Sequence, residues 1–190
     1  MQKLLDRLPM ILTLGRVALI PVFIVLFLNE HIIAAATVFI VASLTDALDG
    51  HIARKRGVVS DWGKLLDPLA DKILVVSALI LFVSKGIVPD WSVVIILARE
   101  FAVTGLRTAV AAKGLVLAAG MTGKIKTVFQ MGAIIVIFLV LIFPDVFAGE
   151  MYIAMVIYWI AVLMTVISGT EYFIRNRKLL KNENIDGTKK

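Results

Sequence analysis

Six long apolar segments determine what this chain can fold into. They cover about residues 8–28, 32–53, 65–84, 88–111, 122–143 and 151–174. Each has about the 20 residues that a helix needs to cross the hydrocarbon core of a bilayer. The chain is 60% hydrophobic, with a mean hydropathy of +0.96, whereas soluble domains are only about half apolar. The segments therefore predict an integral membrane protein with six transmembrane helices.

The apolar segments are continuous, without the alternation of polar and apolar residues that marks a membrane barrel. Unbroken runs of Leu, Ile, Val and Ala favour helices instead. We predict an all-α fold with a single domain over residues 1–174, because only short loops remain between the segments. Residues 1–7 are expected to form an interfacial segment or a frayed terminus, and residues 175–190 a basic cytoplasmic tail.

Basic residues gather on one side of the predicted bundle. They lie at the N-terminus, in the 54–64 loop, in the 112–126 connection and at the C-terminus, whereas the loops on the other side contain only Lys85. By the positive-inside rule, both termini and the 54–64 loop are expected in the cytoplasm. The formal net charge of +6 follows from this topology, so it does not call for a nucleic-acid partner. We predict a multi-pass protein of the cell membrane.

Four aspartates lie at the ends of two apolar segments. Asp46 and Asp49 are three residues apart, and Asp67 and Asp71 are four apart, so each pair lies on one face of its helix. The short loop between the segments makes the two pairs face each other. Carboxylates in a membrane are costly unless a cation offsets them. The chain lacks cysteine and has only two histidines, so the oxygen ligands predict one or two Mg²⁺ or Mn²⁺ ions.

Small residues and an arginine accompany the acids. Gly50 and Ala53 continue the face of Asp46 and leave room for a ligand to approach the backbone. Arg54 and Gly63 flank the same place. Metal ions beside small residues and a guanidinium suit a diphosphate. These residues therefore predict a diphosphate-binding site.

The combined pattern resembles the signature of the CDP-alcohol phosphotransferases, with every position present. Three further stretches, ILTLGRVALIP at 11–21, AREFAVTGLR at 98–107 and GKIKT at 123–127, are similar to the branch of that family that makes phosphatidylglycerophosphate in bacteria. The similarity covers about residues 8–174. The signature consists of Asp46, Asp49, Gly50, Ala53, Arg54, Gly63, Asp67 and Asp71.

The resemblance implies a homodimeric membrane enzyme with a metal-filled cavity open to the cytoplasm. Such an enzyme transfers the phosphatidyl group of CDP-diacylglycerol to sn-glycerol 3-phosphate and releases CMP. Asp71 is expected to act as the general base as well as to contact the metal. The implied metal ligands are Asp46, Asp49, Asp67 and Asp71, and the implied CDP-diacylglycerol site consists of Asp49, Gly50, Ala53, Arg54, Gly63 and Thr13.

The acceptor carries a phosphate, which needs cations that the aspartates do not neutralise. Arg99 and Arg107 are eight residues apart and so lie near one face of their segment, and Arg16 lies within the first. Arginine in lipid is costly enough to indicate a buried anionic partner. Lys124 lies in the GKIKT stretch at the cytoplasmic side. We predict that these four residues bind glycerol 3-phosphate, and that Glu100 pairs with a neighbouring arginine.

Other functions remain open at this stage. The same signature would serve a family member that uses inositol phosphate, serine or phosphatidylglycerol as the acceptor. An ion-coupled transporter would be expected to show repeats and broken helices around a midplane site, which the sequence lacks. A membrane prenyltransferase would place its aspartates in two motifs far apart in the chain. Release of CMP from CDP-diacylglycerol would indicate a phosphotransferase, and release of diphosphate from a prenyl donor would indicate a prenyltransferase. Flux of a substrate across vesicles without a reaction would indicate a transporter.

Overall fold

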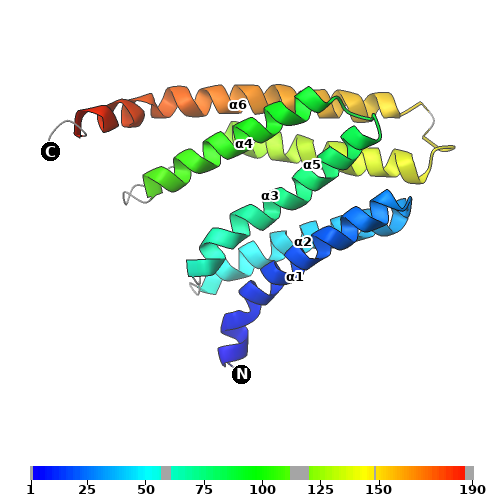
Figure 1. Ribbon diagram of the computed structural model, residues 1–190, viewed down its shortest axis with the longest axis horizontal. Coiled ribbons are helices and arrows are strands. Elements are labelled where there is room, and N and C mark those ends of the chain that lie inside the picture. The colour runs from blue at the N-terminus through cyan, green and yellow to red at the C-terminus, as the bar shows by residue number, and fades with distance from the viewer. Residues whose placement is uncertain (1, 57–60, 112–119, 148, 187–190) are drawn as a thin grey trace. The chain divides into compact units, whose positions relative to one another are not determined.

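The computed structural model describes residues 2–56, 61–111, 120–147 and 149–186, with side chains for residues 15–45, 72–111, 120–147 and 149–177. This part of the chain contains six α-helices and no strand (Figure 1). The helices are α1 (Gln2–Leu28), α2 (Ile32–Arg56), α3 (Asp61–Ser84), α4 (Asp90–Ala111), α5 (Met121–Ile142) and α6 (Met151–Asp186).

The six helices confirm the predicted all-α fold, and most of their ends lie close to the predicted ones. Two ends differ. The first helix begins at Gln2, so the predicted interfacial segment is continuous with α1. The last helix continues to Asp186, so most of the predicted tail is helical. Both extensions are polar, and the apolar pattern used to set the boundaries does not include them.

The chain divides into two compact units. One consists of Met1–Val88 and Phe138–Phe147, and the other of Pro89–Ile137 and Ala148–Lys190. Helix α5 contributes residues to both. The prediction of a single domain over residues 1–174 stays a prediction, and each unit is described by itself.

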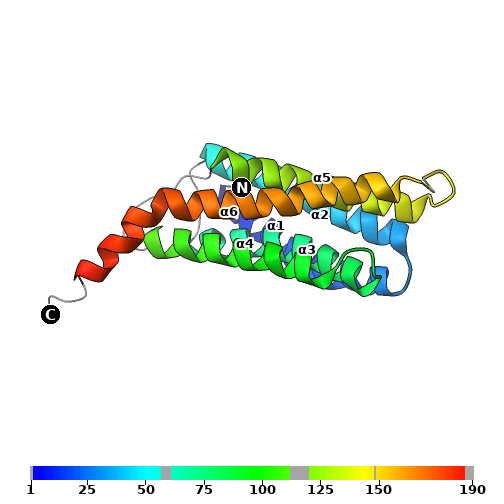
Figure 2. The ribbon, with the colours of Figure 1, turned by 90° about the horizontal axis from the view of Figure 1, so that it is seen from above.

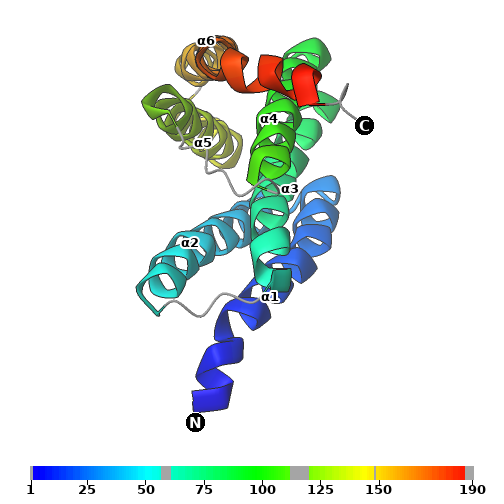
Figure 3. The same ribbon diagram turned by 90° about the vertical axis from the view of Figure 1, so that its left-hand side faces the viewer.

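In the first unit, α1 packs against both α2 and α3 (Figure 3). Five phenylalanines fill its core, and each is at most 2% exposed. Phe138, from the end of α5, is central, because its ring contacts the other four at centroid distances of 5.3 to 6.2 Å. Aromatic pairs at such distances add to the stabilisation from burial. The other members of this phenylalanine cluster are Phe23, Phe27, Phe39 and Phe82.

Helices α1 and α3 end in the same way. After α1, the amide of His31 donates to the carbonyl of Leu26 at 2.9 Å, and Glu30 has a φ of 63°. After α3, the amide of Ile87 donates to the carbonyl of Phe82 at 2.9 Å, and Gly86 has a φ of 69°. A left-handed residue with this bond is the Schellman cap. The side chains of Lys85 and Glu30 form an ion pair between the two caps.

In the second unit, α4 packs against α6, and the C-terminal end of α6 extends beyond that of α4 (Figure 2). A buried hydrogen bond joins the hydroxyls of Ser92 and Tyr158. Thr165 and Ser168 are also buried, and they donate to carbonyls of their own helix. These four buried hydroxyl groups are therefore all hydrogen-bonded.

Among the described residues, α5 and the Met151–Arg177 part of α6 are long and apolar enough to cross a membrane. Shorter apolar stretches in the first three helices cover Gly15–Leu28, Ile32–Thr45 and Lys72–Ser84. One end of each stretch, at Gly15, Thr45 or Lys72, coincides with a limit of the described side chains. Helix α4 has no such stretch because Arg99, Glu100 and Arg107 interrupt its apolar sequence.

Candidate functional site

The predicted aspartates fall on two helices that contact each other, α2 and α3. Both helices are continuous through the aspartate positions, so spacings of three and four residues keep each pair on one face. Among the side chains that the structure describes, no group of three or more acids and histidines could hold a metal ion. The four aspartates lie outside that set. As an all-carboxylate donor set, they fit a hard divalent cation.

The rest of the signature also lies outside the described side chains. Its backbone positions are helical, in α2 for the first five residues and in α3 for the last three. Thr13 lies in α1, and its side chain is likewise not described. The roles of these residues in binding CDP-diacylglycerol stay predictions. The residues concerned are Asp49, Gly50, Ala53, Arg54, Gly63 and Thr13.

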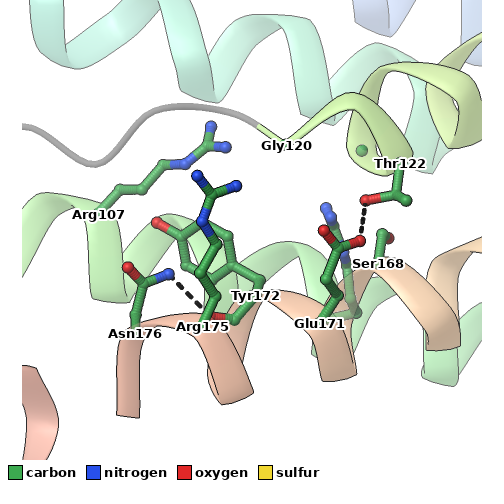
Figure 4. Close-up of a pocket in the computed structure, with 10 residues that line it drawn as sticks. Arg107, Gly120, Thr122, Ser168, Glu171, Tyr172, Arg175 and Asn176 are labelled. Atoms are coloured by element: carbon green, nitrogen blue, oxygen red, sulfur yellow. Dashed lines mark hydrogen bonds between the residues drawn. The ribbon is translucent and has the colours of Figure 1, made fainter. Parts of the chain in front are cut away.

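A cavity of about 270 Å³ lies within the second unit, lined by residues of α4, α5 and α6. Three arginines line it, two of them from α4 and one from α6, together with a single carboxylate. Figure 4 shows the side chains of Arg107 and Arg175 pointing to the same end of the cavity. The charged and polar lining includes Arg99, Arg107, Thr122, Glu171, Tyr172 and Arg175.

Arg107 rests on the ring of Tyr172, with its guanidinium carbon 5.4 Å from the ring centre. This contact is within the range of a cation–π interaction. The Nε of Arg107 and the hydroxyl of Tyr172 are both buried and have no hydrogen-bond partner among the described residues. Buried polar groups in proteins are normally paired. Within the described ranges, these two groups thus lack the partner that buried polar groups usually have, and both belong to residues that line the cavity.

Arg99 belongs to a partly buried group of charges. Its Nη1 donates to Oε1 of Glu100 at 3.0 Å, and Nζ of Lys126 donates to the same oxygen. This confirms the prediction that Glu100 pairs with a neighbouring arginine. Lys126 is only 4% exposed, so its contact with Glu100 joins α5 to α4 inside the unit.

One face of α6 carries residues that the sequence analysis did not assign to the site. Glu171 accepts a hydrogen bond of 2.7 Å from the Thr122 hydroxyl of α5 (Figure 4). Arg175 falls in the basic tail predicted over residues 175–190. The sequence contains a signal for this face, because its residues follow one another at spacings of three, one, three and one, which places them on one side of a helix. This polar stripe of α6 consists of Ser168, Glu171, Tyr172, Arg175 and Asn176.

The four predicted acceptor residues are placed differently. Arg99 and Arg107 line the same cavity, as their spacing on one helix predicted. Lys124 is exposed on α5 and does not line this cavity. Arg16 is 2% exposed and belongs to the other unit. The structure thus brings two of the four together and adds Arg175 to them.

The cavity has the chemistry of an anion site. Guanidinium groups bind phosphate and carboxylate through charge-assisted hydrogen bonds. Its volume of about 270 Å³ is at the small end for ligand pockets, which usually measure about 300 to 1,000 Å³. A small phosphorylated molecule therefore fits it better than a nucleotide or a lipid.

Comparison with known proteins assigns the family. Residues 6–167 match the family model described as CDP-alcohol phosphatidyltransferase. A Bacillus subtilis (strain 168) protein named "CDP-diacylglycerol–glycerol-3-phosphate 3-phosphatidyltransferase" is 44% identical, over 94% of this chain and 99% of its own length. A protein of the same name from Rickettsia bellii (strain RML369-C) is 39% identical, over 90% of this chain and 96% of its own. This chain therefore belongs to the CDP-alcohol phosphatidyltransferase family.

Proposed function

We propose that this chain transfers the phosphatidyl group of CDP-diacylglycerol to the primary hydroxyl of sn-glycerol 3-phosphate and releases CMP. The observation that carries the proposal is the name of the relatives, including one that is 44% identical over 94% of the chain. The complete eight-position signature on α2 and α3 supports it. The relatives' name favours glycerol 3-phosphate over inositol phosphate, serine and phosphatidylglycerol.

In the proposed reaction, Asp71 is the general base. The acceptor hydroxyl attacks the phosphorus that carries the diacylglycerol, and the bond from that phosphorus to the oxygen of CMP breaks. The hydroxyl proton passes to the Asp71 carboxylate, and CMP leaves with the bridging oxygen. Asp46, Asp49, Asp67 and Asp71 would hold one or two Mg²⁺ or Mn²⁺ ions. When bound, these ions neutralise charge on the diphosphate and on the leaving phosphate.

The nucleotide end of the donor is proposed to bind along the signature. Gly50, Ala53 and Gly63 leave space for it, because they carry little or no side chain. Arg54 supplies a guanidinium for the diphosphate. Asp49 and Thr13 complete the proposed donor site.

The cavity of the second unit is proposed to bind the phosphate of glycerol 3-phosphate. Arg99, Arg107 and Arg175 line it, and three guanidinium groups would neutralise a phosphate dianion. The unpaired Nε of Arg107 and hydroxyl of Tyr172 add hydrogen-bond donors. Lys124 and Arg16 stay predictions as further acceptor residues.

All six helices are proposed to cross the cell membrane, with both termini and the active-site cavity facing the cytoplasm. The apolar windows of α5 and α6 are only 39% and 33% buried. Most residues of these windows are therefore at least partly exposed, which suits lipid rather than water. Lys85, the one basic residue predicted on the outer side, is neutralised by Glu30. A homodimer is proposed from the family resemblance.

The deciding experiment incubates purified protein with CDP-diacylglycerol and each acceptor, with and without EDTA. We expect CMP and phosphatidylglycerophosphate with glycerol 3-phosphate, no product after EDTA, and recovery with Mg²⁺ or Mn²⁺. If CMP were released only with serine, inositol phosphate or phosphatidylglycerol, that molecule would replace glycerol 3-phosphate as the proposed acceptor. Release of diphosphate from a prenyl donor, or substrate flux without CMP, would contradict it.

A further inference from the structure

The side chain of Arg99 passes very close to a glycine of α6. A methyl group added at Gly169 would lie 3.0 Å from Cγ of Arg99 and 4.0 Å from both its Cβ and its Nε. Carbon atoms that are not bonded to each other are normally about 3.5 to 4.0 Å apart. An alanine at position 169 would therefore force the stem of Arg99 to shift by a few tenths of an ångström from its observed path.

The other end of the same side chain is also confined. A methyl group at Gly123 of α5 would lie 3.4 Å from Nη2 of Arg99. Nη1 donates to Glu100 at 3.0 Å, and the side chain as a whole is 14% exposed. Arg99 is thus bonded to Glu100 of its own helix and lies close to glycines of α5 and α6. We call Gly123 and Gly169 the glycine slot.

Arg99 also retains an unused donor. Its Nε is buried and makes no hydrogen bond within the described part of the chain, and the residue lines the cavity. A long side chain normally loses rotamer freedom when it binds a ligand, which weakens binding. Because Arg99 is already confined, that loss has occurred before a ligand arrives. Its guanidinium is thus preorganised for an anion.

We propose that Gly169 and Gly123 are positioning residues that set the location of the Arg99 guanidinium and thereby the affinity for the acceptor phosphate. This inference rests on the proposed function and deepens it. A side chain at Gly169 moves the Arg99 stem, while the hydrogen bond to Glu100 restrains the far end. The guanidinium then meets the phosphate at a changed position, although no residue that touches the substrate has been replaced.

The test compares three glycine-to-alanine variants of one unit, graded by the contact that the added methyl group makes. The nearest atom lies at 3.0 Å for Gly169, 3.4 Å for Gly123 and 3.9 Å for Gly132, whose neighbour is Ile157. Gly132→Ala is the control, since it adds the same methyl group at ordinary contact distance. Affinity for glycerol 3-phosphate is measured both as KM and by direct titration, with CDP-diacylglycerol KM and kcat alongside.

We expect Gly169→Ala to raise the glycerol 3-phosphate KM about tenfold, as for one misplaced charge-assisted hydrogen bond. Gly123→Ala should raise it less, and Gly132→Ala should leave it unchanged. The kcat and the CDP-diacylglycerol KM should stay near wild type in all three. In an Arg99→Ala background, Gly169→Ala should add nothing further, because the atom it meets is gone.

Two results would overturn the inference and can be told apart from failure of the proposed function. If Gly169→Ala changes the acceptor KM no more than Gly132→Ala, the slot does not position Arg99 for the substrate. If it lowers kcat, raises both KM values and lowers the unfolding temperature, the glycine only serves helix packing. Wild-type protein that neither binds nor uses glycerol 3-phosphate would instead reject the proposed function, and the slot's role with it.

Discussion

The guanidinium carbon of Arg107 lies 5.4 Å from the centre of the Tyr172 ring, so a cation of α4 rests on an aromatic side chain of α6. Replacing Tyr172 with Leu removes this interaction, which at a partly buried site contributes about 0.5 to 2 kcal/mol. We expect the glycerol 3-phosphate KM to rise severalfold because Arg107 is less well held. Steady-state kinetics with both substrates would measure the change.

Tyr172→Phe is the matched variant for this contact. It keeps the ring under Arg107 but removes the hydroxyl, which has no partner among the described residues. If the ring supports Arg107, Phe should preserve more acceptor affinity than Leu. Equal losses in the two variants would contradict a contribution from the cation–π contact and attribute the effect to the hydroxyl.

Arg107 and Arg175 are both expected to bind the acceptor phosphate. Replacing either with Ala should remove charge-assisted hydrogen bonds of about 1.5 to 3 kcal/mol, which corresponds to an increase of roughly ten- to more than a hundredfold in the glycerol 3-phosphate KM. CDP-diacylglycerol binding should hardly change. The measurement is the KM of each substrate with the other at saturation.

Two exposed basic residues serve as comparisons. Arg177 lies two residues from Arg175 but does not line the cavity, so Arg177→Ala should leave the acceptor KM near wild type. Lys124→Ala tests the lysine predicted from the sequence. Since Lys124 is exposed and outside this cavity, we expect a smaller rise than for Arg107→Ala. Equal effects for Arg175 and Arg177 would mean that general surface charge attracts the acceptor.

These residues also show how far sequence reasoning reaches. The spacing of Arg99 and Arg107 was enough to place both on one face, because helical periodicity is local. Arg175 was missed because a basic residue after an apolar segment is explained by topology alone. The closeness of Gly169 to Arg99 is of another kind. It depends on which helices pack together and on how far each is shifted along the axis of the other. Neither follows from the sequence pattern of a single helix.

The same distinction applies to the fold. Continuous apolar runs predicted all six helices. The phenylalanine cluster also needs Phe138, which α5 contributes to the first unit. Both Phe138 and Phe143 lie in the apolar segment predicted over residues 122–143, and its apolar pattern does not show which of the two is buried. In the structure the first is 2% exposed and the second 50%.

Phe138→Ala should therefore destabilise the protein strongly. Truncating a buried phenylalanine costs about 3 to 5 kcal/mol in protein cores through lost contacts and a residual cavity. Phe143→Ala removes the same atoms from an exposed position and should change stability by much less. Thermal unfolding in detergent would compare the two variants, and a similar fall in unfolding temperature for both would contradict the cluster as the centre of the core.

Asp71→Asn should abolish phosphatidyl transfer while CDP-diacylglycerol still binds. The amide can remain near the metal but cannot accept the proton of the acceptor hydroxyl. Asp46→Ala should instead weaken both metal and nucleotide binding. Turnover and CDP-diacylglycerol affinity would be measured in each variant. If Asp71→Asn kept most of its turnover, the base would have to be another group.

The length of α6 has a consequence for how two unlike substrates meet. Its apolar part, Met151–Arg177, has 27 residues and measures about 40 Å, roughly 10 Å more than the hydrocarbon core. On the proposed topology, the excess carries the polar stripe of α6 into the layer of lipid head groups. A water-soluble acceptor can reach that layer without entering the hydrocarbon core. A lipid donor can present its head group there without leaving the bilayer. The reaction would then occur at the boundary between the two phases.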